Sequence, residues 1–204
     1  MESANDYAAR LGALLLDPAE TVQMSAPGNV KAAVLVPLYV QNGDLTAVFT
    51  KRPADMRRHA GEISFPGGRR DDGEELQETA LREAEEEIGL ERDLVNVVGG
   101  LPPTGTFVTS YEIYPFVGLT APGGTFRPNP VEVDEIVELS LPDLIAGYEK
   151  KRLIRRGVPI KTDTYTVGGH LIWGATARIL AGLLERLQPL LSAAENRGAV
   201  NHPR

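Results

Sequence analysis

The chain has 204 residues with a formal net charge of −7, and 42% of its residues are hydrophobic. This length and composition predict a single domain over residues 1–204 and exclude a fibrous or disordered chain. The absence of cysteine excludes disulfides, thiolate metal sites and a cysteine nucleophile. The acidic balance argues against a nucleic acid polymer as a partner.

The ends and apolar stretches of the chain contain no targeting or membrane signal. The first residues lack a basic segment followed by a long apolar run, so they do not form a signal peptide. The longest uncharged apolar stretch, residues 32–40, is far too short to cross a bilayer. We therefore expect a cytoplasmic protein with no membrane partner.

Hydrophobic periodicity and turn residues predict alternating strands and helices. The first half shows a helix over 7–16, a strand hairpin over 32–40 and 45–51, a loop over 53–68, a helix over 75–88 and strands over 95–99 and 113–119. The second half shows a loop over 122–130, a strand over 135–139, a short helix over 141–148, a hairpin over 151–156 and 160–167, and a helix over 175–191. The polar residues after 194 are expected to fray. Strands around a central helix, with a long helix at the end, predict an α/β sandwich around a mixed sheet.

Charge is unevenly distributed about residue 70. Residues 51–70 contain six Lys or Arg residues and two acids, whereas residues 71–91 contain ten carboxylates and only Arg82 as a base. Two solvated faces would explain this pattern. So would an anion site beside a cation site, which a metal-bound phosphate ester requires.

Three glutamates gather on one face of the helix predicted over 75–88. Glu83, Glu86 and Glu87 stand at i, i+3 and i+4, within side-chain reach of one another. Carboxylates this close repel, and a hard cation such as Mg²⁺ or Mn²⁺ would neutralise them. The alternative is an ordinary acidic surface helix in which Arg82 pairs with Glu78 or Glu86.

The wider spacing distinguishes these alternatives. From residue 68 to residue 90 the chain has Gly68, five residues, Glu74, seven residues, an Arg-Glu pair, two residues, a Glu-Glu pair, one residue, a Gly and an apolar residue. The segment, GRRDDGEELQETALREAEEEIGL, resembles the Nudix box throughout. The resemblance implies the Nudix α/β/α sandwich around a mixed β-sheet. It also implies an enzyme that hydrolyses nucleoside diphosphates linked to a further group, using Mg²⁺ or Mn²⁺.

The resemblance implies a role for each residue of the box. Glu83 and Glu87 would be the principal metal ligands, and Glu86 a further ligand or the base that activates water. Arg82 would orient these glutamates by ion pairing. The expected catalytic residues are therefore Arg82 and the three glutamates. Gly68 would allow a tight turn into the helix, and its carbonyl would reach the metal.

Three other acids have secondary assignments. Glu74 belongs to the box, where it would brace the loop against the helix. The general base of this family can lie on a later loop, where Glu132 and Glu135 precede the strand predicted over 135–139. For each of these two taken alone, a plain surface acid is the more frequent explanation.

The segment upstream of the box, residues 48–68, reads VFTKRPADMRRHAGEISFPGG. It resembles the motif that precedes the box in the coenzyme A pyrophosphatase subfamily. Two departures occur: Val48-Phe49 replaces two leucines, and Pro53 replaces a serine, which removes a hydroxyl and a backbone donor. The matching residues are Thr50, Arg52, Arg57, Gly61 and the run Phe65-Pro66-Gly67-Gly68.

This second resemblance implies a small-molecule substrate, coenzyme A or a derivative, cut to 3′,5′-ADP and 4′-phosphopantetheine. The extra phosphate of coenzyme A calls for guanidinium groups, and Arg52 and Arg57 are the candidates. Thr50, Gly61 and Phe65 are further substrate-binding candidates, although Phe65 would serve equally as a core anchor for its loop. The alternatives are a Nudix enzyme for ADP-ribose, a dinucleotide or a nucleoside triphosphate, and a non-catalytic Nudix module that senses a nucleotide.

Overall fold

The structure, a computed structural model, describes residues 4–53, 61–106, 110–121, 126–155 and 158–200. The helices within these ranges are α1 Ala4–Gly12, α2 Pro18–Gln23, α3 Leu76–Ile88, α4 Leu141–Ala146 and α5 Gly174–Val200, with a 3₁₀ turn at Arg92–Leu94. The strands are β1 Val30–Gln41, β2 Asp44–Lys51, β3 Ile63–Ser64, β4 Gly67–Arg69, β5 Asn96–Gly100, β6 Thr104–Gly105, β7 Tyr111–Leu119, β8 Glu135–Ser140, β9 Tyr148–Arg155, β10 Val158–Val167 and β11 His170–Trp173.

The larger sheet is built around β1, which pairs with three neighbours. Five strands run in the order β3-β2-β1-β7-β5, while β4 also pairs with β1, β6 with β7 and β8 with β2. β1 and β7 are parallel, whereas β1 pairs antiparallel with β2 and with β4. The sheet is therefore mixed, as predicted.

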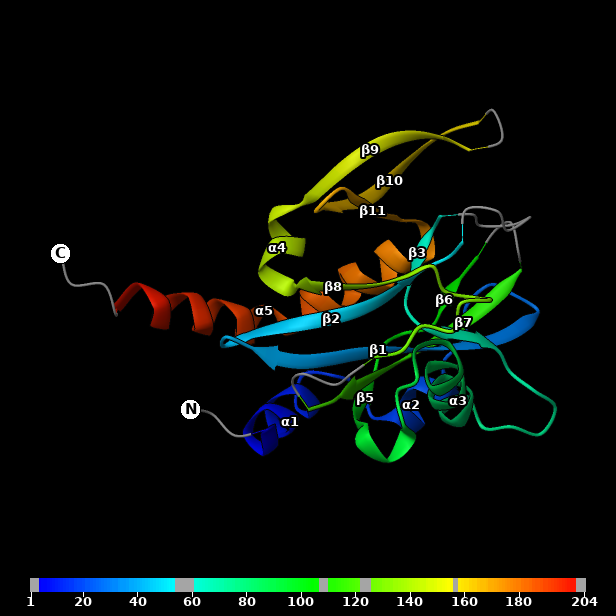
Figure 1. Ribbon diagram of the computed structural model, residues 1–204, viewed down its shortest axis with the longest axis horizontal. Helices are drawn as coiled ribbons and strands as arrows, with labels where there is room; N and C mark the ends of the chain where they lie inside the picture. Colours follow the sequence, from blue (N-terminus) through cyan, green and yellow to red (C-terminus); the bar gives the residue numbers. More distant parts are fainter. Residues whose placement is uncertain (1–3, 54–60, 107–109, 122–125, 156–157, 201–204) are drawn as a thin grey trace.

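Helices cover both faces of this sheet, which confirms the α/β/α sandwich. Figure 1 shows α4 and α5 on one side of β1 and α3 on the other. Successive residues of β1 alternate between the two layers: Val36 and Leu38 enter the core beneath α5, whereas Ala33 and Leu35 enter the core beneath α3. A strand buried on both faces needs an almost unbroken apolar run, which explains the composition of β1.

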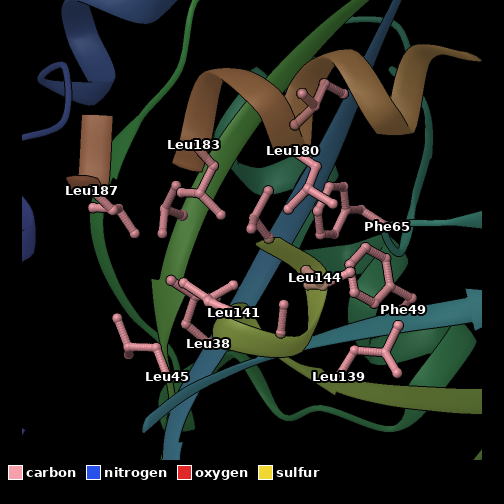
Figure 2. Close-up of a cluster of buried hydrophobic side chains, with 14 of the residues drawn as sticks. Leu38, Leu45, Phe49, Phe65, Leu139, Leu141, Leu144, Leu180, Leu183 and Leu187 are labelled. Atoms are coloured by element: carbon pink, nitrogen blue, oxygen red, sulfur yellow. The ribbon is translucent and has the colours of Figure 1, made fainter. Parts of the chain in front are cut away.

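The core beneath α5 is the larger of the two. Figure 2 shows the leucines of α5 pointing toward the first hairpin and α4. The buried residues of α5 lie between Ala177 and Leu190, so this face of the helix is committed to the core. The labelled leucines are Leu38, Leu45, Leu139, Leu141, Leu144, Leu180, Leu183 and Leu187.

A second sheet, in the order β11-β10-β9, carries the predicted C-terminal hairpin. The hairpin is confirmed, but its turn was predicted over 157–159, whereas Val158 already pairs with Arg155 and Pro159 with Ile154. Pro159 is tolerated in β10 because β11 pairs only with the stretch from Thr164 onward. Its missing N–H therefore faces an edge with no strand beside it.

Several boundaries differ from the prediction for identifiable reasons. The loop over 53–68 contains β3 and β4, which have two and three residues and so show no periodicity. The helix expected over 141–148 ends at Ala146, and β9 begins two residues later. The last helix continues to Val200 through residues that were expected to fray. Ala and Glu in that stretch are good helix formers, which favours the continuation.

Helix α2 was not predicted, although its signal is present in the sequence. Asp17 accepts a hydrogen bond from the Ala19 N–H, and Glu20 accepts one from the Asp17 N–H. This is a capping box with Pro18 in the first turn, and both features mark helix starts.

No helix in the described part of the chain combines the length and apolar composition required to cross a bilayer.

Replacing Leu183 by alanine tests the role of α5. Leu183 is fully buried between α5 and the large sheet, so Leu183→Ala is expected to lower the free energy of unfolding by about 3 kcal/mol through lost burial and a cavity. The matched control is Ile154→Ala, since Ile154 is 79% exposed and its removal should change stability by no more than about 0.5 kcal/mol. Equal urea midpoints for the two variants would contradict this account.

Candidate active site

Helix α3 is fixed in the sandwich by its apolar side and by its C-terminus. Leu76, Ala80, Ala84 and Ile88 are buried beneath it. The helix ends at Gly89, whose φ of +65° allows its N–H to donate to the Glu85 carbonyl. The flank that carries the box glutamates is therefore held against β4.

Gly68 lies directly beneath the Glu83 carboxylate. It pairs with Ala33 of β1, and a Cβ atom added to it would lie 2.4 Å from the Glu83 carboxyl carbon. Only a glycine leaves space for the carboxylate on the strand backbone. The expected tight turn is elsewhere, at Gly73, whose φ is +79°. Gly68 is thus needed for close approach and not for a turn.

Glu87 is the most deeply buried acid of the box, with only 4% of its surface exposed. Its Oε2 accepts a hydrogen bond of 3.2 Å from the Gly67 N–H. Burial is the main cause that raises the pKa of Glu87 to about 8; the nearby carboxylates of Glu83 and Glu132 act in the same direction, whereas the Gly67 hydrogen bond and Arg52 oppose the shift. Within the described part of the chain, no Lys or Arg side chain forms an ion pair with this carboxylate.

Arg82 braces the glutamates as expected. Its Nε and Nη2 donate to the two oxygens of Glu74 at 2.8 and 3.1 Å, which is a bidentate pair. Its Nη1 donates to Glu83 at 2.8 Å and to Glu86 at 3.2 Å. The Arg82 hydrogen bond holds the pKa of Glu74 at about 2, and Thr79 adds a further donor at 2.7 Å.

Glu86 differs from the other two glutamates of the face. Its side chain is 55% exposed, whereas that of Glu83 is 15% exposed. Among the described residues, no three acidic or histidine side chains converge in the arrangement of a metal centre. Arg82 holds Glu83 and Glu86, so a cation would have to draw these carboxylates toward Glu87.

The donor set nevertheless fits a hard divalent cation. Burial raises the pKa of Glu83, with Glu86 and Glu132 adding repulsion against the stabilising Arg82. A buried and a half-buried carboxylate whose charges are mutually unfavourable are neutralised by an ion that takes oxygen ligands. The residues that would hold it are Glu83 and Glu87, with Glu86 and the backbone at Gly68 beside them.

The fold also brings the candidate base Glu132 to the site. It is half-buried, and its charge affects the pKa of both Glu83 and Glu87. The preceding segment caps α3, since the Asn129 N–H donates to the Glu87 carbonyl at 2.9 Å. The other candidate, Glu135, instead forms an ion pair of 2.8 Å with Lys51.

The candidate substrate residues fall into different environments. Arg52 acts electrostatically on Glu87, and its Nε is buried without a hydrogen-bond partner among the described residues. Thr50 is buried and its hydroxyl lies 3.2 Å from that of Ser64, so it braces β2 against β3. Gly61 has a φ of +68° and is exposed.

Two further candidates complete this set. The Phe65 ring stacks on Phe49 with 4.6 Å between centroids and is 2% exposed, which favours its role as a core anchor. Arg57 lies outside the described residues.

Three features together define the Nudix class of hydrolases. They are the α/β/α sandwich, a helix whose glutamates pair with an arginine, and a strand with glycine beside those glutamates. The NUDIX domain matches residues 29–159 of the chain. The protein called "Uncharacterized Nudix hydrolase NudL" of Photorhabdus laumondii is 36% identical over 191 residues, covering 92% of this chain and 100% of the relative. The NudL of Pectobacterium atrosepticum is 37% identical over 153 residues, covering 74% of this chain and 79% of the relative. The chain belongs to the Nudix family, and it is a Nudix hydrolase.

Solved structures share the fold at low sequence identity. A MutT/nudix family protein from Enterococcus faecalis gives a TM-score of 0.56 at 13% identity, covering 93% of this chain and 76% of that one. The C. elegans Ap4A hydrolase gives 0.54 at 16% identity, covering 81% and 99%. The NUDIX domain of Shewanella oneidensis NrtR, complexed with ADP ribose, gives 0.53 at 15%, covering 85% and 97%. Nudix hydrolases generally use divalent metal ions such as Mg²⁺ or Mn²⁺ and act on nucleotide derivatives.

The raised pKa of Glu87 predicts how stability depends on pH in the metal-free protein. The folded state keeps a proton that the unfolded chain releases, between the ordinary pKa of 4.5 and the folded value of about 8. The free energy of unfolding therefore falls as pH rises through this window. Glu87→Gln removes the titration, so its melting temperature in chelator should fall less than that of the wild type between about pH 5 and about pH 9.

The control for this prediction is Glu86→Gln, which alters an exposed carboxylate on the same helix. It should follow the wild-type pH dependence. Parallel curves for Glu87→Gln and the wild type would show that the Glu87 carboxyl is not buried as described.

Gly68→Ala tests the contact between the glycine strand and Glu83. The added Cβ would lie within 2.5 Å of both carboxylate oxygens, and the flexible Glu83 side chain would move away. Hydrolysis should fall by about a hundredfold, since small displacements at a reacting centre have large effects. Circular dichroism should show an intact fold. Gly182→Ala is the control, because nothing lies within 4 Å of that site, and unchanged activity in Gly68→Ala would contradict the proposed contact.

Proposed function

We propose that this Nudix hydrolase cleaves the diphosphate of coenzyme A, or of a coenzyme A derivative, to give 3′,5′-ADP and 4′-phosphopantetheine. The observation that carries the proposal is the position of Arg52, the motif arginine upstream of the box. Its charge acts on Glu87 of the box, which supports a single site shared by the upstream motif and the box.

The surroundings of Arg52 support a role in phosphate binding. Its backbone is fixed on both sides, since its N–H donates to the Glu62 carbonyl and its carbonyl accepts from the Gly61 N–H, each at 3.1 Å. Its Nε is buried with no hydrogen-bond partner in the described part of the chain. A planar guanidinium with an unused donor suits a phosphate oxygen, and coenzyme A carries a 3′-phosphate besides its diphosphate.

Different residues of the site have different roles in the proposed reaction. Glu83 and Glu87 would hold Mg²⁺ or Mn²⁺, which when bound neutralises charge that develops on the phosphate. Arg82 keeps Glu83 in place, and the Gly67 N–H does the same for Glu87. Arg52 orients the substrate and adds positive charge at the phosphates.

The base that takes a proton from water remains to be assigned among three acids. Glu86 is engaged by Arg82, and Glu135 by Lys51. The Lys51 hydrogen bond lowers the pKa of Glu135, which makes that carboxylate a weaker base. Glu132 is the candidate that the geometry favours, because it acts on both metal-site glutamates and no ion pair is recorded for it among the described residues.

Product analysis tests the proposal. Coenzyme A, ADP-ribose and a nucleoside triphosphate would be incubated in parallel with the protein and Mg²⁺ or Mn²⁺, and again with chelator. We expect metal-dependent release of 3′,5′-ADP from coenzyme A, faster than turnover of the other two. Glu83→Gln should abolish it, and Arg52→Lys should lower kcat/KM by about tenfold, because lysine cannot form the bidentate contact.

Two other outcomes have distinct meanings. Faster turnover of ADP-ribose or of the triphosphate would keep the Nudix hydrolase and refute coenzyme A as the substrate. Metal-dependent binding of a nucleotide without turnover of any of them would support a nucleotide-sensing module.

A further inference from the structure

A single carboxylate joins three strands at the edge of the site. Lys51, the last residue of β2, donates from Nζ to Oε2 of Glu135, the first residue of β8, at 2.8 Å. The two residues are register partners, and the Asp134 N–H donates to the Lys51 carbonyl at 2.8 Å. His170 of β11 lies 3.7 Å from the other Glu135 oxygen. The ion pair therefore ties the end of β2 to the start of β8.

Two candidate site residues lie close to this pair in the sequence. Arg52 follows Lys51 directly, and Glu132 lies three residues before Glu135. The Glu132 N–H donates to the Asn129 carbonyl at 3.0 Å, and the Asn129 N–H donates to the Glu87 carbonyl at 2.9 Å, so the segment before β8 is joined to the helix of the metal-site glutamates. On the other strand end, the Arg52 carbonyl accepts from the Gly61 N–H at 3.1 Å. The distance between these two strand ends therefore affects the positions of both Arg52 and Glu132.

We propose that the Lys51–Glu135 ion pair is a positioning unit that sets the separation of Arg52 and Glu132 across the metal site. The inference rests on the proposed function only in taking Arg52 as a phosphate ligand. The side chains of Lys51 and Glu135 are 33% and 43% exposed, and ion pairs of this exposure contribute little to stability. The ion pair instead affects the positions of Arg52 and Glu132, and small displacements of groups at a reacting centre change the rate of catalysis strongly. Glu135 is then a positioning residue and not the general base.

A double-mutant cycle tests this role. Lys51→Met and Glu135→Gln should each raise KM by about tenfold, since the substrate-binding arginine is displaced, and lower kcat by up to about tenfold, since Glu132 is displaced with it. The double variant should be no worse than either single variant, because both remove one interaction. Lys51→Arg keeps the ion pair and should restore KM to within about threefold of the wild type.

The matched control is Lys150→Met, which breaks the 3.7 Å ion pair with Asp163 in the small sheet. It should leave KM and kcat unchanged.

Three results would overturn the proposal. Loss of kcat by a hundredfold or more in Glu135→Gln alone would identify Glu135 as the general base. Multiplying effects in the double variant would show that the residues act separately. Lower melting temperatures with unchanged KM would show a purely structural pair.

The cycle is read with whichever substrate the product analysis identifies. If ADP-ribose or a triphosphate is turned over in place of coenzyme A, the proposed function fails while the cycle still tests the ion pair. Failure of the two proposals is thereby distinguishable.

Discussion

The structure depends on the packing of two glutamates, the half-buried Glu83 and the buried Glu87, between a helix and the backbone of a neighbouring strand. Removing carboxylates from water is costly unless they are hydrogen-bonded and neutralised. Arg82 supplies this for Glu83, whereas Glu87 receives, from the described residues, the hydrogen bond of the Gly67 N–H and the charge of Arg52 without an ion pair. Part of the compensation is left to an ion of opposite charge, which is how a site of this kind acquires affinity for a divalent cation.

The strand beside these glutamates, β4, is itself enclosed between two rigid elements of the sandwich. Gly67 and Gly68 are the first two residues of β4, and a Cβ on Gly67 would lie 2.4 Å from the Ala33 carbonyl oxygen, just as one on Gly68 would meet Glu83. The glycine pair is thus enclosed between β1 and α3, with no space on either side. Because β1 is buried on both faces and α3 is capped by Gly89, neither wall can move freely. Rigid elements on both sides keep the carboxylates in a defined geometry.

Much of the fold was predictable because its elements are long and periodic. The strands β1, β2, β7 and β8 and the helix α3 were each predicted to within two residues at either end, since their apolar residues repeat at the period of the element. β3, β4 and β11 were missed because two to four residues cannot show a period, and β4 is a strand only through its pairing with β1. The turn over 157–159 was misplaced because Pro159 is compatible with a strand only where the neighbouring strand has ended.

The sequence by itself determined the family and the box, because they follow from spacing within one continuous stretch, residues 68–90. It also determined the helix face that carries Glu83, Glu86 and Glu87, because these positions are i, i+3 and i+4 of one helix. It also pointed to Arg52, through a motif that lies in the same stretch of chain. Only the tertiary structure decided that Gly68 admits the Glu83 carboxylate, that Glu132 approaches the site and that Glu135 is bound by Lys51. Those relations join residues far apart in the chain, and the packing of strands and helices sets such distances, which spacing along one element cannot encode.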